Sequence, residues 1–320
     1  MNIQGLIIDP QMDFCWPGLK AMGVDVDCAY WKSMEPALKM AMGPNYLRLV
    51  NPGALYVNGA EKDMDRLAQM IHRLGDKIDD FHITLDSHRK VDQAHPIWWK
   101  DSSGRRPDPF TILGTQGSKV VRMEPQGDGS LKATNDEYQT YLPSMMNKGG
   151  PLGTGSRGYL EELQKNSRYP HVVWPEHCLI GTTGHTIWPS LMEALMAWEE
   201  DFSVVDYVTK GSNIGTEHYS GVCAEVPDPS DSSTQVNIRL IETLEEADLI
   251  FLAGEARSHC LANTVRDVAK HFSDPKYIQK LVLLTDATSD VTGFEAYGDL
   301  FVKEMTALGM QLSTTDEFLR

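Results

Sequence analysis

Short apolar runs alternate with segments of helical periodicity along most of this chain. The following runs have the length and composition of buried strands: 3–9, 80–85, 202–207, 249–253, 281–285 and a short one near 310–314. Between them, apolar residues recur every three or four positions, which predicts helices over 60–74, 190–200, 258–272 and 294–308. This alternation predicts a three-layer α/β/α sandwich around a mostly parallel, Rossmann-like sheet. We expect one domain over residues 1–320.

Two segments interrupt the alternation and are predicted to be insertions. Residues 15–57 are rich in Met, Pro and Gly without a sustained period, which indicates an elaborated loop with one helix around 34–42. Residues 100–170 are polar and rich in Gly, Ser, Asn and Pro, with short strands such as Ser118–Met123. We expect this second insertion to lie on the surface, where part of it could cover a binding crevice as a lid.

The stretch 248–272 places a cysteine where an open α/β sheet binds its ligands. An apolar run ends at Gly254, and helical spacing begins at Ser258, so Cys260 falls in the first turn of a helix beyond a central strand. Free backbone N–H groups and the helix dipole favour a thiolate there, which could attack a carbonyl carbon. A small buried core thiol explains the same pattern equally well, and this stretch alone does not decide between them.

Other charged residues also follow predicted strands. Asp9 ends the first strand, although a turn or helix-capping aspartate is the commoner explanation for such a residue. Lys210 follows the run 202–207 beside glycines, where a lysine is usually a solvated loop cation. Because the carboxyl ends of parallel strands meet at one edge, both side chains could share a crevice with Cys260.

A possible metal site follows the second strand. Asp86 and His88 are one residue apart, so their side chains can share one face of an extended segment, and such a pair suits Zn²⁺, Fe²⁺ or Mn²⁺. His177 could complete a triad of ligands, and His95 could be a further ligand or a substrate-side group. Cys178 is a rival thiol, but no strand-to-helix turn presents it, so we interpret it as structural.

Composition narrows the possible partners. The net charge of −16 argues against binding to nucleic acid or an anionic membrane, since the electrostatic contribution would be repulsive. No apolar run approaches transmembrane length, and the N-terminus lacks the pattern of a signal peptide. The five cysteines are odd in number and form no CxxC pair, which fits the reducing cytoplasm.

Taken together, these segments resemble the nicotinamidase/isochorismatase-like cysteine hydrolases. The matching blocks occur in the order of the family and span the chain apart from the insertions: LIIDPQMDF, TLDSH, WPEHCLIGTTG, TKGSNIGTEHYSG, ARSHCLANTV and LLTDATS. Each block is a weak motif alone, but the ordered set is a strong signal. The resemblance implies the isochorismatase-like hydrolase fold.

The resemblance also implies a catalytic triad of Asp9, Lys210 and Cys260. The aspartate would take the thiol proton, and Lys210 would keep that carboxylate ionised and help to stabilise the thiolate. The oxyanion hole of the family uses a cis peptide before the nucleophile, which corresponds here to the bond Glu255–Ala256. The donors would be the backbone N–H groups of Ala256 and Cys260.

The nicotinamidase branch of the family is marked by a metal, here expected at Asp86, His88 and His177. The expected cofactor is one divalent ion, zinc in the first place and iron or manganese as alternatives, which holds the ring nitrogen of a pyridine directly or through water. Compact nicotinamidases often carry an extra histidine ligand, and His95 stands near that place. The expected aromatic walls of the pocket are Phe14, Trp174 and Tyr219.

The function implied by the resemblance is hydrolysis of nicotinamide to nicotinic acid and ammonia through a cysteine thioester. The alternatives are a related cysteine hydrolase for another amide, carbamoyl or hydrazide substrate, since the insertions and the AHPIWW segment could reshape the pocket, or a non-catalytic binding protein. The expected partner is a small-molecule amide, with neither nucleic acid nor membrane. We expect a cytoplasmic protein, and a homo-oligomer is possible.

Overall fold

The computed structural model describes residues 1–43, 45–127, 130–142, 146, 155–166 and 169–320, and its centre is a parallel sheet. Six strands lie in the order β11-β10-β9-β1-β2-β8, and every neighbouring pair is parallel. Their bounds are β1 Ile3–Ile8, β2 Asp80–Asp86, β8 Asp206–Lys210, β9 Leu249–Gly254, β10 Leu281–Leu284 and β11 Gln311–Ser313. All of β1 is buried, which explains its continuous apolar run.

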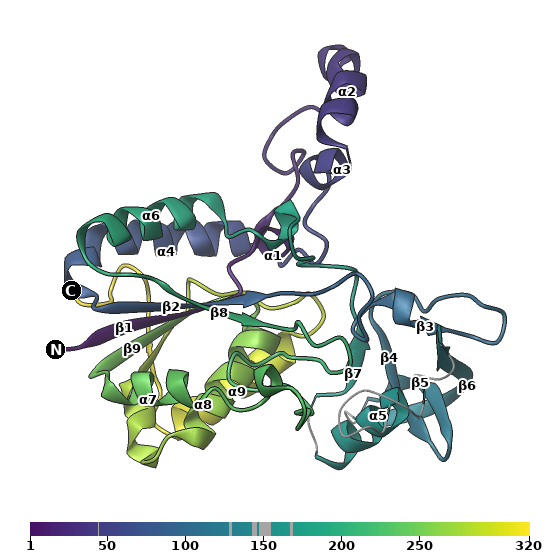
Figure 1. Cartoon of the computed structure of the whole chain (residues 1–320). Helices are drawn as coiled ribbons and strands as arrows, with labels where there is room; N and C mark the ends of the chain where they lie inside the picture. The colour runs from purple at the N-terminus through teal and green to yellow at the C-terminus, as the bar shows by residue number, and fades with distance from the viewer. Residues whose placement is uncertain (44, 128–129, 143–145, 147–154, 167–168) are drawn as a thin grey trace.

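Helices cover both faces of this sheet (Figure 1). On one face lie α4 (Ala60–Leu74) and α6 (Pro189–Asp201), and on the other α7 (Ile238–Glu246), α8 (Ala262–His271) and α9 (Glu295–Ala307). The periodic apolar side chains of α4 are buried against the sheet, as its pattern predicts. The three-layer α/β/α sandwich is therefore confirmed. Within the described part of the chain, no helix combines the length and apolar character needed to cross a membrane.

Two elements differ from the prediction for this sheet. The third strand lies at 206–210 and not at 202–207, because Phe202 and Val204 are 52% and 78% exposed just after α6 ends. An apolar run is thus not sufficient evidence for a buried strand. The helix α7 is also additional to the prediction. Its nine residues bury Leu240, Ile241 and Leu244, a face too short to be distinguished from loop by periodicity.

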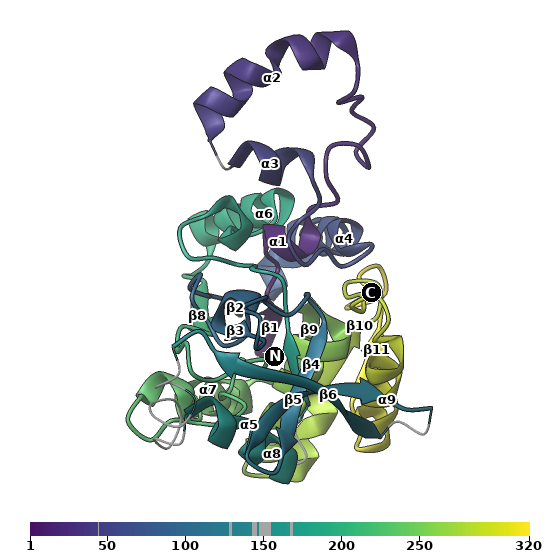
Figure 2. The ribbon, with the colours of Figure 1, turned by 90° about the vertical axis from the view of Figure 1, so that its right-hand side faces the viewer.

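The second insertion contributes most of a five-stranded antiparallel sheet with the order β3-β6-β5-β4-β7. Its elements are β3 Trp99–Lys100, β4 Thr111–Gln116, β5 Lys119–Pro125, β6 Leu131–Thr140 and β7 His171–Val173, accompanied by α5 Gly155–Lys165. Figures 1 and 2 show it beyond the carboxyl ends of the parallel strands. The predicted lid stays a prediction, since 143–145 and 147–154 lie outside the described residues.

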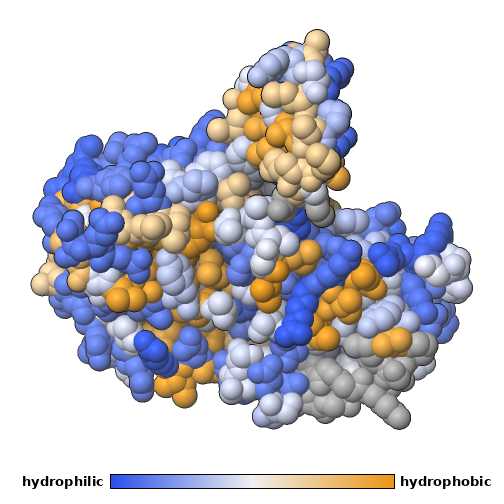
Figure 3. Space-filling model, turned by 45° about the horizontal axis from the view of Figure 1, so that its top comes forward, coloured by the Kyte–Doolittle hydropathy of each residue, from blue (hydrophilic) through white to orange (hydrophobic). Residues whose placement is uncertain are grey.

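The first insertion forms an arm that projects from the body of the molecule (Figures 1 and 2). After α1 (Met12–Cys15), it contains α2 (Ala29–Met42) and α3 (Asn45–Val50), so the expected single helix begins earlier than predicted and a second one follows. No described residue of α2 is buried. Apolar residues gather on the arm in Figure 3, and Met40 is 86% exposed. An ion pair of 3.0 Å from Arg48 to the buried Asp13 ties α3 to the body.

Candidate active site

The predicted nucleophile follows a sharp turn at the end of β9. Gly254 has a φ of 106°, and a Cβ there would lie 2.1 Å from the backbone oxygen of Ile8, so only glycine fits. The next peptide bond, Glu255–Ala256, is cis, as the resemblance implied. A π-helical turn, Arg257–Leu261, then leads into α8 and carries Cys260, which is 8% exposed. Such turns are frequent at functional sites.

Lys210 lies at the centre of the site, at the last position of β8. Its ammonium nitrogen is 2.8 Å from Asp9 Oδ2, 3.0 Å from Asp86 Oδ1 and 3.7 Å from Cys260 Sγ. Asp86 is its direct neighbour in the register of β2 and β8. Asp9 follows β1 with a φ of 44°, and its Oδ1 accepts a hydrogen bond of 2.6 Å from the Thr84 hydroxyl. The structure thus brings together the three residues predicted as a triad.

Burial and the charge of Lys210 act in opposite directions on the pKa values of this group. It raises the pKa of the Cys260 thiol well above its usual range, although Lys210 opposes the effect. Burial likewise raises the pKa of Asp9 against the influence of Lys210. For Asp86, burial is outweighed by His88 and Lys210, which hold the pKa of that carboxyl well below its usual range. Lys210 thus acts on Asp9 and Cys260 in the predicted direction, toward the charged forms, while burial opposes it. Because burial outweighs Lys210 at Cys260, the thiol needs a base when it reacts.

Three imidazoles and one carboxylate converge beside Lys210. Asp86 Oδ2 lies 3.1 Å from both His88 Nε2 and His177 Nε2. His95 belongs to the same cluster, because one ring nitrogen from each histidine lies within 4.8 Å of the others. All four side chains are buried. The predicted ligands Asp86, His88 and His177 are therefore close together, and His95, whose place the sequence left open, is with them.

The hydrogen bonds of these rings fit a metal site. His177 Nδ1 donates to the carbonyl of Pro175 at 2.8 Å, and His88 Nδ1 contacts Asp92 Oδ2 at 3.1 Å, which turns both Nε2 atoms toward the carboxylate. Nε2 of His88 and of His95 are buried without a hydrogen-bond partner among the described residues. Burial, aided by the other two histidines, lowers the pKa of His95 to about 2, so its ring is neutral. Nitrogen lone pairs around a carboxylate suit a divalent ion such as Zn²⁺, Fe²⁺ or Mn²⁺.

If the histidine cluster and Asp86 hold a metal, removal of one histidine should weaken metal binding. We expect His88→Ala to lower the metal content, measured by elemental mass spectrometry after dialysis against zinc, by at least about 10-fold relative to the wild type. His72→Ala, an exposed histidine of α4, is the matched control and should retain the metal. Equal metal content in the two variants would contradict this assignment.

A narrow cavity of about 20 Å³ lies over Cys260, well below the usual size of ligand pockets. The three predicted aromatic walls, Phe14, Trp174 and Tyr219, all line it, and so do Ala256 and Cys260. The Trp174 indole N–H donates to the Tyr219 hydroxyl at 2.9 Å, which fixes both rings. Among the described residues, no acceptor contacts the Ala256 amide, which leaves that donor available to a ligand.

Comparison of the sequence with protein-family models gives no match, and comparison with curated proteins gives none either. Solved structures match nearly the whole chain. The nicotinamidase/pyrazinamidase of Acinetobacter baumanii is 14% identical, with a TM-score of 0.54, over 98% of this chain and 97% of that chain. The yeast nicotinamidase Pnc1p bound to the inhibitor nicotinaldehyde is 13% identical, with a TM-score of 0.54, over 98% of this chain and 99% of that chain. The chain has the nicotinamidase fold.

Within this nicotinamidase fold, several side chains in or beside the pocket were not predicted. Thr84 holds Asp9, and the Gln11 amide pairs with both the backbone N–H and the carbonyl of Asp86 at 2.8 Å. Glu217 Oε1 lies 4.0 Å from the His88 ring, and burial raises the pKa of this carboxyl to about 7. Thr84 could have been found, because it lies two residues before Asp86 on the same face of β2.

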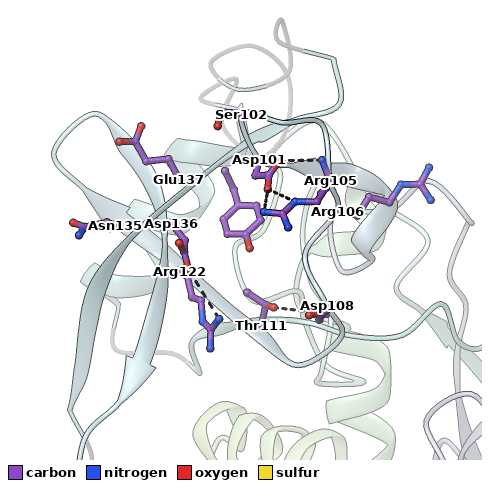
Figure 4. Close-up of a pocket in the computed structure, with 11 residues that line it drawn as sticks. Asp101, Ser102, Arg105, Arg106, Asp108, Thr111, Arg122, Asn135, Asp136 and Glu137 are labelled. Atoms are coloured by element: carbon purple, nitrogen blue, oxygen red, sulfur yellow. Dashed lines mark hydrogen bonds and ion pairs between the residues drawn. The ribbon is translucent and has the colours of Figure 1, made fainter.

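The nicotinamidase fold also carries a groove on its second sheet, lined by the loop before β4 and by β4–β6 (Figure 4). Its charged side chains are largely paired with one another. Arg105 lies 3.1 Å from Asp101, and Arg122 lies 4.0 Å from Asp136. The groove shares none of its lining residues with the cavity over Cys260.

Proposed function

We propose that this protein is a cysteine amidohydrolase of the nicotinamidase family that contains a divalent metal ion and converts nicotinamide and water into nicotinic acid and ammonia. The observation that carries the proposal is the position of Lys210, whose ammonium contacts both Asp9 and Cys260 at the base of an aromatic cavity. A buried thiol beside a buried carboxylate is the arrangement that nucleophilic catalysis requires. The fold shared with two nicotinamidases supports the same reaction.

In the first half of the reaction, Asp9 takes the proton of Cys260 as the sulfur attacks the amide carbon. The raised pKa of Asp9, caused by burial, makes this carboxylate a stronger base than an exposed aspartate. The backbone N–H groups of Ala256 and Cys260 stabilise the oxyanion, and Lys210 balances the negative charge. The C–N bond then breaks, Asp9 returns the proton to the leaving nitrogen, and ammonia departs from a thioester.

In the second half, Asp9 takes a proton from water as its oxygen attacks the thioester carbon. The C–S bond breaks, Cys260 recovers the proton, and the carboxylic acid leaves. A divalent ion held by the residues of the histidine cluster and Asp86 would supply a Lewis-acid contact that orients the ring nitrogen of the substrate. Phe14, Trp174 and Tyr219 would enclose the ring.

A second candidate is hydrolysis of another amide, carbamoyl or hydrazide compound by the same residues. It is favoured by the contact between the pocket wall and the second insertion, where the Phe110 ring packs against Trp174 with ring centroids 5.8 Å apart. Side chains that reach the pocket wall from an insertion can change which ring fits.

Ammonia release from a panel of amides tests the proposed function. We expect nicotinamide to be hydrolysed, and removal of the metal by chelation to lower kcat/KM by at least about 10-fold, with recovery when the ion is added back. Release of ammonia from other panel members but not from nicotinamide would support the second candidate. No turnover on any member, together with a Cys260 that does not react with iodoacetamide, would instead indicate a binding protein.

A further inference from the structure

Two buried carboxyl groups lie directly behind the turn that carries Cys260. Glu255, the residue before Ala256, is fully buried, and Asp63 of α4 is 3% exposed. Ser289, from the loop after β10, contacts both groups: its N–H donates to Glu255 Oε2 at 3.1 Å, and its hydroxyl donates to Asp63 Oδ2 at 2.6 Å. Ser289 therefore brings the two carboxyl groups close together, and each of them shifts the pKa of the other.

Two buried carboxyl groups held together by Ser289 would repel each other if both were ionised, so one of them should keep its proton. The surrounding charges indicate which one. Arg66 pairs with Asp63 at 2.5 Å, so Asp63 has a counter-ion. Glu255 has no cation within salt-bridge distance among the described residues, and no donor reaches its Oε1. Burial, followed by the charge of Asp63, raises the pKa of Glu255 well above its usual range. Glu255 is therefore the protonated partner.

The groups that face Glu255 from the other elements do not change this assignment. Cys15 of α1 is buried, and its thiol pKa is raised well above its usual range by burial and then by Glu255, so it stays neutral. Asp290 adds negative charge, but it is paired with Arg257. Both neighbours leave Glu255 without a positive partner.

We propose that Glu255 is a positioning residue, which keeps its proton, donates it in a hydrogen bond to Asp63 and thereby fixes the turn that carries Ala256 and Cys260. The inference rests on the proposed function for its effect on turnover. Three segments meet through this contact: α4 through Asp63, the loop after β10 through Ser289, and the turn after β9 through Glu255 itself.

The backbone transmits the contact to the nucleophile. Glu255 N donates to Ile8 O at 2.7 Å, and Arg257 N donates to Ser289 O at 2.8 Å, so the residues on both sides of Ala256 are anchored. Ionisation of Glu255 would place two negative charges in contact inside the protein and would force them apart. The Ala256 amide and Cys260 would move with the turn, and both belong to the reacting group of residues proposed above.

The protonation of Glu255 can be tested without any substrate. In the unfolded chain, Glu255 ionises near the ordinary glutamate pKa of 4.5, whereas in the folded chain it stays protonated to higher pH. Above pH 4.5 the unfolded state therefore binds fewer protons than the folded state. The unfolding equilibrium constant then rises by up to about 10-fold per pH unit, until the pH reaches the pKa of Glu255 in the folded protein. Glu255→Gln cannot ionise, so we expect its stability in urea, relative to the wild type, to increase between about pH 5 and 8. Parallel stability curves for the two proteins would overturn the proposal.

The positioning role is tested by turnover. We expect Glu255→Ala to lower kcat by about 10- to 100-fold with KM changed less than about 3-fold, because the oxyanion donor and the thiol lose their fixed geometry. Glu255→Gln keeps a neutral donor toward Asp63 and should recover most of the lost kcat. The exposed Glu242→Gln on α7 is the matched control and should behave as the wild type. A Gln variant as impaired as the Ala variant would overturn the positioning role.

The two measurements separate this inference from the proposed function. If the wild type hydrolyses no amide, the proposed function fails, while the pH dependence of stability still decides whether Glu255 is protonated. The rate at which iodoacetamide alkylates Cys260, followed by mass spectrometry, then replaces turnover as the measure of positioning. It should differ between the wild type and Glu255→Ala and be restored in Glu255→Gln. If Glu255→Ala fails to fold, the pH dependence of the stability of Glu255→Gln still decides whether Glu255 is protonated, and kcat of Ser289→Ala, which lacks the hydroxyl that contacts Asp63, replaces that of Glu255→Ala. Wild-type kcat in Ser289→Ala would then overturn the positioning role.

Discussion

Replacement of Cys260 by alanine should abolish ammonia release, with kcat falling by at least about 10⁵-fold. The loss should be this large because the sulfur forms the covalent bond, and no other described thiol touches Lys210. Metal content should not change, since the sulfur is not among the converging ligand atoms. Turnover by a coupled ammonia assay and elemental analysis of the same preparation check both statements.

Two further cysteine variants give this experiment its controls. Cys28→Ala removes a partly exposed thiol of the arm and should leave turnover unchanged. Cys178→Ala examines the rival thiol, which is fully buried and follows the metal-side residue His177. If Cys260→Ala were active and Cys178→Ala inactive, the nucleophile would have been assigned to the wrong cysteine.

Replacement of Asp9 by asparagine should lower kcat by about 10³-fold with little change in KM. The thiol has a raised pKa because it is buried, so it cannot ionise at neutral pH without a base in contact, and asparagine is not one. Alkylation of Cys260 by iodoacetamide should slow in parallel, and this readout needs no substrate. Both rates are measured on the same preparation.

The matched control for Asp9→Asn is the same substitution at Asp201, an exposed residue at the end of α6. It should show wild-type turnover and alkylation. Wild-type alkylation in Asp9→Asn, despite lost turnover, would show that Asp9 acts later in the reaction than thiol deprotonation. Wild-type turnover would remove Asp9 from the mechanism altogether.

The local sequence pattern predicted the central sheet well, because a parallel strand buried on both faces has a continuous apolar sequence, which few other secondary-structure elements have. It misplaced β8, where Phe202 and Val204 are apolar yet exposed, since exposure depends on what packs nearby and not on the residue itself. The second sheet was expected only as short strands. Its outer strands pair with strands far along the chain, β3 with β6 and β7 with β4, and pairing over such distances leaves no local period.

The positions of the candidate site residues could be predicted from where the strands end, but their charge states could not be predicted from the sequence. Asp9, Lys210 and Cys260 could be placed at one sheet edge because parallel strands end together there. Whether Lys210 or burial controls the protonation of Cys260 depends on how completely water is excluded, which no sequence spacing records. The same limit applies to Glu255, whose carboxyl has no predicted role in the sequence and becomes notable only through its burial beside Asp63.

A single ammonium serves both halves of this pocket. Lys210 contacts Asp86 on the side of the histidine cluster and Asp9 on the side of the sulfur. If Asp86 is neutralised, the whole positive charge falls to Asp9, which becomes a weaker base although its own surroundings are intact. A substitution on the side of Asp86 and the histidine cluster should therefore also change the reactivity of the thiol. The effects on kcat of two substitutions on opposite sides of Lys210 should not be additive. Ligand binding on the side of Asp86 and the base strength of Asp9 are therefore coupled.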